Sequence, residues 1–65
     1  MEVGTRVRVS KDAGYQADEL AVGATGVVGQ IVSTEMVGVY IDGYREPMFN
    51  EGGWGYSIDT LEVIE

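Results

Sequence analysis

Residues near the start of the chain alternate between apolar and polar side chains. From Val3 to Val9 the odd positions carry Val or Thr, whereas the even positions carry Gly or Arg. A period of two is typical of a strand that buries one face and exposes the other. The pattern predicts a strand over residues 5–10, with Val7 and Val9 facing the core.

A second strand is predicted over residues 25–33, which are uncharged and rich in β-branched side chains. Gly26 and Gly29 interrupt this run and indicate bulges or close approaches of the backbone in a curved strand. We expect the odd positions, Val27 and Ile31, to point inward.

A third strand is predicted over residues 36–42, where Val37, Val39 and Ile41 share one face. Only a short connection separates it from the second strand, so the two are expected to pair as a hairpin. Asp42 and Gly43 then form a turn signal.

The end of the chain predicts a fourth strand headed by Tyr56, a single helical turn over residues 57–61 and a last strand over residues 62–65. Ser57 and Asp59 are the candidate caps of the turn. Two long irregular segments remain, residues 11–24 with a short turn near residues 17–20, and residues 44–55. Loops of this length often carry function.

Five short strands without a long helix predict an all-β fold in a single domain over residues 1–65. A sheet this small hides its apolar face most economically by bending into a five-stranded small barrel, with the first and last strands as neighbours and one short 3-10 turn before the last strand. The predicted core is Val7, Val9, Leu20, Val27, Ile31, Val37, Val39, Ile41, Phe49, Ile58, Leu61 and Val63.

Composition narrows the functional classes. The chain has 4 Lys and Arg against 11 Asp and Glu, a net charge of −7, which opposes binding to phosphate backbones and favours a basic partner. An acidic surface that serves solubility alone is the alternative. The absence of Cys and His removes thiol and imidazole catalysis and the usual zinc ligands. We therefore predict no enzyme activity, no cofactor and no metal site.

Aromatic side chains gather in the two long loops, near several carboxylates. Tyr and Trp offer large rigid surfaces with a polar group, and acids steer Lys- or Arg-bearing segments toward them. This combination predicts a partner-binding site for a basic protein surface or peptide. Its members are Tyr15, Asp18, Glu19, Tyr44, Trp54 and Tyr56. The alternative is that Trp54 and Phe49 cap an undersized core and the tyrosines line its rim.

Two further hypotheses compete with this one. Arg6, Arg8 and Lys11 form a basic strip that permits a nucleic-acid role, either by direct contact or by mimicry through the acidic surface, although the arginines are expected to pair with acids across the sheet such as Glu62. A structural homo-oligomer would instead bury the outward-facing Met36, Tyr40 and Val32. No signal sequence or membrane-length apolar stretch is visible, so we expect a cytoplasmic protein without membrane contact.

Three segments carry a family resemblance, namely residues 3–9, 23–31 and 37–42. They resemble the first three strands of KOW-type and other SH3-like small barrels, and residues 58–64 look like the final turn and strand of these domains. The resemblance implies an SH3-like barrel that binds RNA or a protein. The short acidic layout is also similar to small accessory proteins of actinobacterial phages, which implies contact with a host or phage protein in the host cytoplasm.

Overall fold

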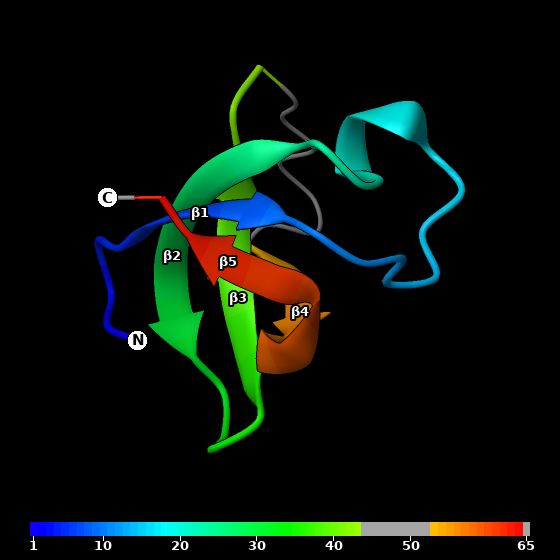
Figure 1. The fold of residues 1–65 in the computed structure, drawn as a ribbon. Helices are drawn as coiled ribbons and strands as arrows, with labels where there is room; N and C mark the ends of the chain where they lie inside the picture. The colour runs from blue at the N-terminus through cyan, green and yellow to red at the C-terminus, as the bar shows by residue number, and fades with distance from the viewer. Residues whose placement is uncertain (44–52, 65) are drawn as a thin grey trace.

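The computed structural model describes residues 1–43 and 53–64, which form one antiparallel sheet of five short strands (Figure 1). Along the sheet the strands follow the order β4-β3-β2-β1-β5. Their bounds are Arg6–Val9 for β1, Thr25–Ile31 for β2, Met36–Ile41 for β3, Trp54–Ser57 for β4 and Leu61–Val63 for β5. Helical structure in the described ranges consists of the 3-10 turns η1, Asp18–Leu20, and η3, Ile58–Thr60. No helix in those ranges is long and apolar enough to span a membrane.

The all-β prediction is confirmed, as are the hairpin of β2 with β3, the pairing of β1 with β5 and the 3-10 turn before the last strand. The observed strands are shorter than predicted at several ends, and Tyr56 is the third residue of β4 rather than its first. β4 and β5 form the two edges of the sheet, which is not closed into a ring.

β1 lies between β2 and β5 in the sheet. Val7 is opposite Gly26 of β2 on one side and Val63 of β5 on the other. Residues directly opposite one another across an antiparallel pair share a face of the sheet. Val7 and Val9 are both 1% exposed, as their alternation predicts.

A bulge in β2 changes which side chains face the core. The register with β3 shifts between Val28 and Gln30, and the glycine between them lies beneath the ring of Tyr40, where an added Cβ would overlap the ring. Because of the extra residue, the even-numbered residues before the bulge face the core, and Val28 is fully buried. The prediction that Val27 points inward is therefore wrong.

Ile31 lies beyond the bulge and is opposite Val37, which is fully buried. Nevertheless 45% of Ile31 is exposed, so the prediction that it belongs to the core is also wrong. The physical reason is that β1 pairs with β2 only as far as Val27. The last residues of β2 therefore extend past the end of β1, the strand that pairs with the first residues of β2.

Among residues 1–43 and 53–64 the core contains nine buried residues, drawn from every strand and from η1. They are Val7, Val9, Leu20, Val28, Val37, Val39, Ile41, Tyr56 and Leu61. Val28 and Tyr56 were not predicted. Among the predicted members, Val63 is 55% exposed because it ends an edge strand, and Ile58 is only partly buried. Phe49 lies outside the described residues.

The 3-10 turn η3 has no side-chain cap, contrary to the prediction for Ser57 and Asp59. A side-chain hydrogen bond is instead made by Thr60, the last residue of the turn. The Thr60 hydroxyl donates a 2.7 Å hydrogen bond to the carbonyl oxygen of Ser57, which closes the turn from its end. Asp59 is exposed.

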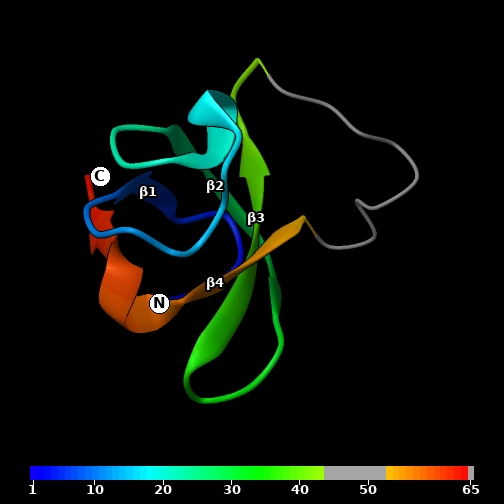
Figure 2. The ribbon, with the colours of Figure 1, turned by 90° about the vertical axis from the view of Figure 1, so that its right-hand side faces the viewer.

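The segment between β1 and β2 leaves the sheet as a wide excursion that carries η1 (Figures 1 and 2). Two backbone hydrogen bonds fix its base, from the N–H of Val9 to the carbonyl of Ala24 and from the N–H of Gly23 to the carbonyl of Val9, both 2.8 Å long. At the far end Leu20 is only 3% exposed and anchors the excursion in the core. The short turn predicted near residues 17–20 is confirmed.

Candidate interaction surface around Tyr15 and Trp54

Tyr15 connects the first long loop to the edge strand β4. Its hydroxyl donates a 2.7 Å hydrogen bond to the carbonyl oxygen of Gly55, and Figure 2 shows the loop passing alongside β4. Its ring meets the ring of Trp54 edge to face, with centroids 5.8 Å apart at 83°. Burial raises the pKa of the Tyr15 hydroxyl, partly offset by the bond to Gly55. The loop is thereby held against the sheet by a half-buried aromatic side chain.

Trp54 begins β4 opposite Val39, and Tyr56 follows two residues later opposite Val37. Alternation along the strand places both side chains on the face that covers the core. Trp54 is half-buried, whereas Tyr56 is 1% exposed. Of Tyr15, Trp54 and Tyr56, only the first two therefore offer aromatic surface to a partner.

Tyr56 supports this surface from beneath. Its hydroxyl donates a 2.6 Å hydrogen bond to the carbonyl oxygen of Leu20, and its ring centroid lies 5.2 Å from that of Tyr15. Burial, and then the charge of Tyr15, raise the pKa of Tyr56 to about 12. A tyrosine predicted to meet a partner is thus a core residue that joins β4 to η1.

Asp18 and Glu19 begin η1 and are exposed directly before the buried Leu20. The hydroxyl of Tyr56 bonds to the carbonyl of Leu20, the residue that directly follows these two acids, so η1 is joined to the strand that carries Trp54. A third acid shapes the loop, since the carboxylate of Asp12 accepts a 2.8 Å hydrogen bond from the N–H of Gly14, just before Tyr15. The surface formed by Tyr15, Trp54, Asp18 and Glu19 is called the aromatic-acidic surface below.

The remaining predicted member of the site, Tyr44, lies outside the described residues. Phe49, which the alternative interpretation of the cluster invoked, also falls there. The two carbonyl oxygens that orient the cluster, those of Gly55 and Leu20, were not predicted. No sequence signal marks them, because every residue carries a carbonyl and only the tertiary fold brings a tyrosine hydroxyl to it.

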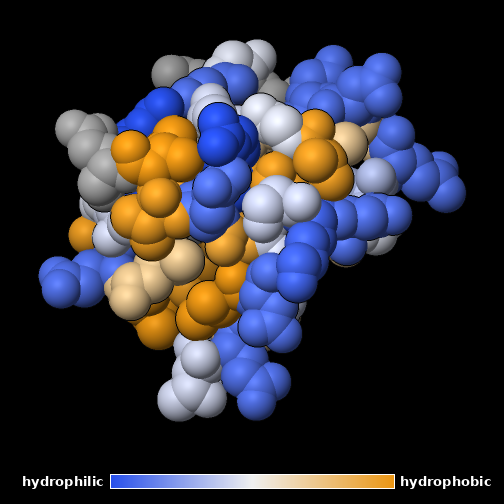
Figure 3. Space-filling view, viewed as in Figure 1, coloured by the Kyte–Doolittle hydropathy of each residue, from blue (hydrophilic) through white to orange (hydrophobic). Residues whose placement is uncertain are grey.

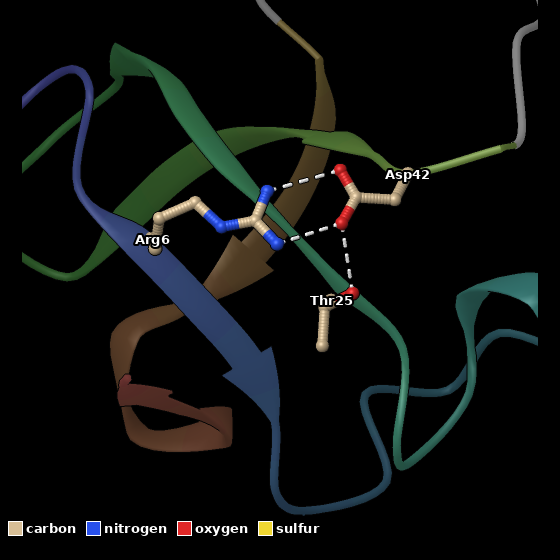
Figure 4. Close-up of polar contacts among 3 residues, drawn as sticks. All are labelled: Arg6, Thr25 and Asp42. Carbon is tan, nitrogen blue, oxygen red and sulfur yellow. Dashed lines mark hydrogen bonds and ion pairs between the residues drawn. The ribbon is translucent and has the colours of Figure 1, made fainter. Parts of the chain in front are cut away.

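The ion pairs of the described chain lie on the outer face of the sheet. The guanidinium of Arg6 makes two hydrogen bonds to the carboxylate of Asp42, of 3.1 and 2.8 Å, and the Thr25 hydroxyl donates a 2.9 Å bond to the same carboxylate (Figure 4). The hydrogen bond from Arg6, followed by that from Thr25, lowers the pKa of Asp42.

Arg8 pairs with Glu62 across the β1–β5 ladder, with 2.8 Å between nitrogen and oxygen. The predicted pairing of the two arginines with acids across the sheet, such as Glu62, is confirmed. In the part of the chain that the structure describes, the two arginines of β1 each contact a carboxylate, while Asp18 and Glu19 take part in neither ion pair.

The described residues contain no group of three acidic side chains close enough to hold a metal ion. Comparison of the chain with protein-family models, curated proteins and solved structures found no significant match.

Proposed function

We propose that this domain is a non-enzymatic interaction module that binds a Lys- or Arg-bearing segment of a partner protein through its aromatic-acidic surface. One observation carries the proposal. The half-buried Tyr15 is fixed against β4 by its 2.7 Å hydrogen bond to Gly55 and meets Trp54 there, while Tyr56 of the same strand bonds to Leu20, which directly follows the exposed acids of η1.

The aromatic pair suits the role of an anchor. Tyr and Trp are enriched among the residues that dominate binding energies, because each buries a large area while losing few torsional degrees of freedom. Tyr15 is already held by its hydroxyl and by two ring contacts. A partner that packs on this pair therefore does not have to immobilise Tyr15, because its side-chain entropy was already lost on folding.

Charge supports a basic partner. The chain carries a net charge of −7, and the carboxylates of Asp18 and Glu19 are not neutralised by either ion pair of the described residues. A cationic side chain approaching η1 gains attraction from both acids, and the acidic surface as a whole speeds its encounter. Lys and Arg also stack favourably on aromatic faces.

The proposal includes an SH3-like small-barrel architecture. It is supported by the strand order β4-β3-β2-β1-β5, in which the first and last strands are neighbours, and by the 3-10 turn between β4 and β5. In such an arrangement the β1–β2 loop and the start of β4 meet at one rim, as Tyr15 and Trp54 do.

A nucleic-acid role receives less support. Arg6 and Arg8 each contact a carboxylate on the outer face, so a phosphate would have to replace an existing partner. The net negative charge opposes this exchange at low ionic strength, where phosphate contacts are otherwise strongest.

The proposal is tested with a library of short immobilised peptides that carry Lys or Arg beside Pro. Binding of the best peptide is then followed in solution through the emission of Trp54, the single tryptophan of the chain. We expect binding that weakens as salt is added. The double change Asp18→Asn, Glu19→Gln should weaken it about threefold to tenfold through lost attraction.

The matched control is Glu2→Gln, Glu35→Gln, which removes the same charge from exposed acids outside η1 and should leave binding close to wild type. Trp54→Phe keeps an aromatic ring and, followed with labelled peptide, should cost less than Trp54→Ala. Equal effects of the η1 and control pairs would refute the site, and no binding by any basic peptide at low salt would refute the function. A mobility shift with nucleic acid at low salt would favour the alternative.

A further inference from the structure

Asp42 and Gly43 form the only Asp–Gly pair of the sequence, directly after the end of β3. In such a pair the backbone nitrogen of the glycine can attack the side-chain carboxyl carbon of the aspartate and close a cyclic succinimide. Glycine hinders this reaction least, because it has no side chain beside the attacking nitrogen. Asp12, Asp18 and Asp59 are each followed by a residue that carries a side chain.

The turn requires glycine at this position and leaves it open to solvent. Gly43 has a φ of 75°, which residues with a side chain rarely adopt, and a Cβ built on it would meet nothing within 4 Å. The side chain of Asp42 is 48% exposed and that of Arg6 is 34% exposed. Figure 3 shows hydrophilic side chains at the surface around β1, which carries Arg6. Water therefore reaches this part of the sheet.

The reaction needs no partner except water. The nitrogen of Gly43 forms a bond to the carboxyl carbon of Asp42 and gives up its proton, while one carboxyl oxygen leaves as water. A second water molecule then opens the ring at one of its two carbonyl carbons. One product is aspartate again, and the other is isoaspartate, in which the backbone runs through the former side chain. Ring closure proceeds from the neutral carboxyl group, because a carboxylate is a poor electrophile.

Three hydrogen bonds restrain this carboxyl group. Arg6 donates to Oδ1 of Asp42 at 3.1 Å and to Oδ2 at 2.8 Å, and the hydroxyl of Thr25 donates to Oδ2 at 2.9 Å. Figure 4 shows the carboxylate directed toward β1, while the chain continues from Asp42 in the opposite direction. The group therefore has to break these bonds before its carbon can turn toward the nitrogen of Gly43.

The same bonds favour the unreactive charged form. A guanidinium that binds both carboxylate oxygens stabilises the negative charge. The hydrogen bonds from Arg6 and then from Thr25 lower the pKa of Asp42, so the neutral acid is scarcer in the folded chain than in the unfolded chain.

Only the folded sheet brings these partners together. Arg6 begins β1, Thr25 begins β2, and Asp42 directly follows β3. The N–H of Asp42 also donates a 2.9 Å hydrogen bond to the carbonyl oxygen of Thr25. Arg6 thus reaches across β2 to a residue 36 positions later in the chain. Unfolding removes this restraint from the carboxyl group.

We propose that Arg6 and Thr25 protect Asp42 from conversion to isoaspartate, and that Asp42 becomes a modification site when their contact is lost. Isoaspartate lengthens the backbone and shortens the side chain, which moves the carboxylate away from Arg6. The modification therefore breaks the contact that joins β1 to the end of β3. The site is separate from the aromatic-acidic surface, and the inference does not depend on the proposed function.

The test follows the formation of isoaspartate while the chain is incubated at neutral pH, by peptide mapping and mass spectrometry. The isoaspartyl peptide keeps its mass but separates in chromatography, and the succinimide is lighter by one water molecule. Wild type in urea gives the rate of the unfolded chain. We expect the folded chain to react about tenfold more slowly, or slower still. Equal rates would overturn the protection, and no isoaspartate in urea would overturn the modification site.

Two variants test the contact itself. Arg6→Gln removes the guanidinium and should speed the reaction about threefold to tenfold, the scale set by a half-exposed ion pair with its hydrogen bonds. Thr25→Val removes only the hydroxyl and should speed it less. The matched control is Arg8→Gln, which removes the same charge and the ion pair with Glu62 from the same strand. It should react at the rate of wild type.

Circular dichroism and urea denaturation establish that each variant is folded during the incubation. Where Arg6→Gln lowers the folded fraction, Thr25→Val decides the outcome. Equal acceleration by Arg6→Gln and Arg8→Gln would assign the effect to a general loss of stability and overturn the proposal. Wild-type rates in both Arg6→Gln and Thr25→Val would overturn it as well.

Discussion

The hydroxyl of Tyr56 donates a 2.6 Å hydrogen bond to the carbonyl oxygen of Leu20, 36 residues earlier in the chain. The bond joins edge strand β4 to the turn η1 and lies within the core, where both residues are almost fully buried. It also joins η1, which carries Asp18 and Glu19, to the strand that carries Trp54. The stability of the fold and the geometry of the aromatic-acidic surface therefore depend on the same contact.

Tyr56→Phe should destabilise the chain by about 1–3 kcal/mol, since it leaves the buried carbonyl of Leu20 without a partner while keeping the ring in place. Urea denaturation measures the change, and the denaturant dependence should stay that of wild type. Tyr15→Phe removes a more exposed hydrogen bond and should cost less. An equal loss of stability in the two variants would contradict the structural role assigned to the hydrogen bond between Tyr56 and Leu20.

The same hydroxyl predicts a loss of stability in alkali. The pKa of Tyr56 rises from the ordinary 10.0 to about 12 on folding, so the folded chain holds this proton more tightly than the unfolded chain. The stabilisation is fully present below pH 10.0 and is lost as the pH rises toward about 12. The free energy of unfolding, measured as the pH rises above 10.0, should fall less steeply for Tyr56→Phe than for wild type.

Asp42 predicts the opposite dependence in acid. Its pKa is lower in the folded chain than the usual 3.8, because Arg6 and then Thr25 bind the carboxylate. The stabilisation is present above pH 3.8 and is lost as the pH falls through the lower folded value. Thermal unfolding of Asp42→Asn should be less sensitive to acid than wild type. The control Asp59→Asn changes an exposed carboxylate of η3 and should retain the wild-type acid sensitivity.

Two glycines of β2 should respond differently to alanine. A Cβ at Gly26 would overlap the backbone oxygen of Tyr40 and lie 2.9 Å from Cγ1 of Val39, both fixed within the sheet. A Cβ at Gly29 would meet only the ring of Tyr40, which is 45% exposed and can rotate away. We expect Gly26→Ala to cost about 1–3 kcal/mol or more, and Gly29→Ala clearly less. Chemical denaturation of both variants measures the two losses of stability. A larger loss for Gly29→Ala than for Gly26→Ala would contradict this expectation.

The number of strands could be predicted because each strand is a local pattern. Val37, Val39 and Ile41 occupy every second position of β3, and all three are buried, as the alternation predicts. The pairing of Arg8 with Glu62 was also accessible, because neighbouring first and last strands bring opposite charges face to face.

The inward side of β2 was not accessible in the same way. Glycine at position 29 indicated a bulge, but the side to which Val27 and Val28 point depends on whether the register shifts before or after them. The ring of Tyr40, from another strand, occupies the space beside Gly29, and no local pattern in β2 indicates that contact.

The sequence by itself determined the all-β class, the hairpin, the turn before the last strand and the grouping of aromatics with acids, because alternation and turn residues act over a few neighbouring positions. Only the tertiary structure decided that Tyr56 is a core residue and that Trp54 is half-buried beside Tyr15. Those outcomes depend on which distant segment covers each side chain or pairs with each strand. Contacts between residues far apart in the chain leave no periodic signal within it.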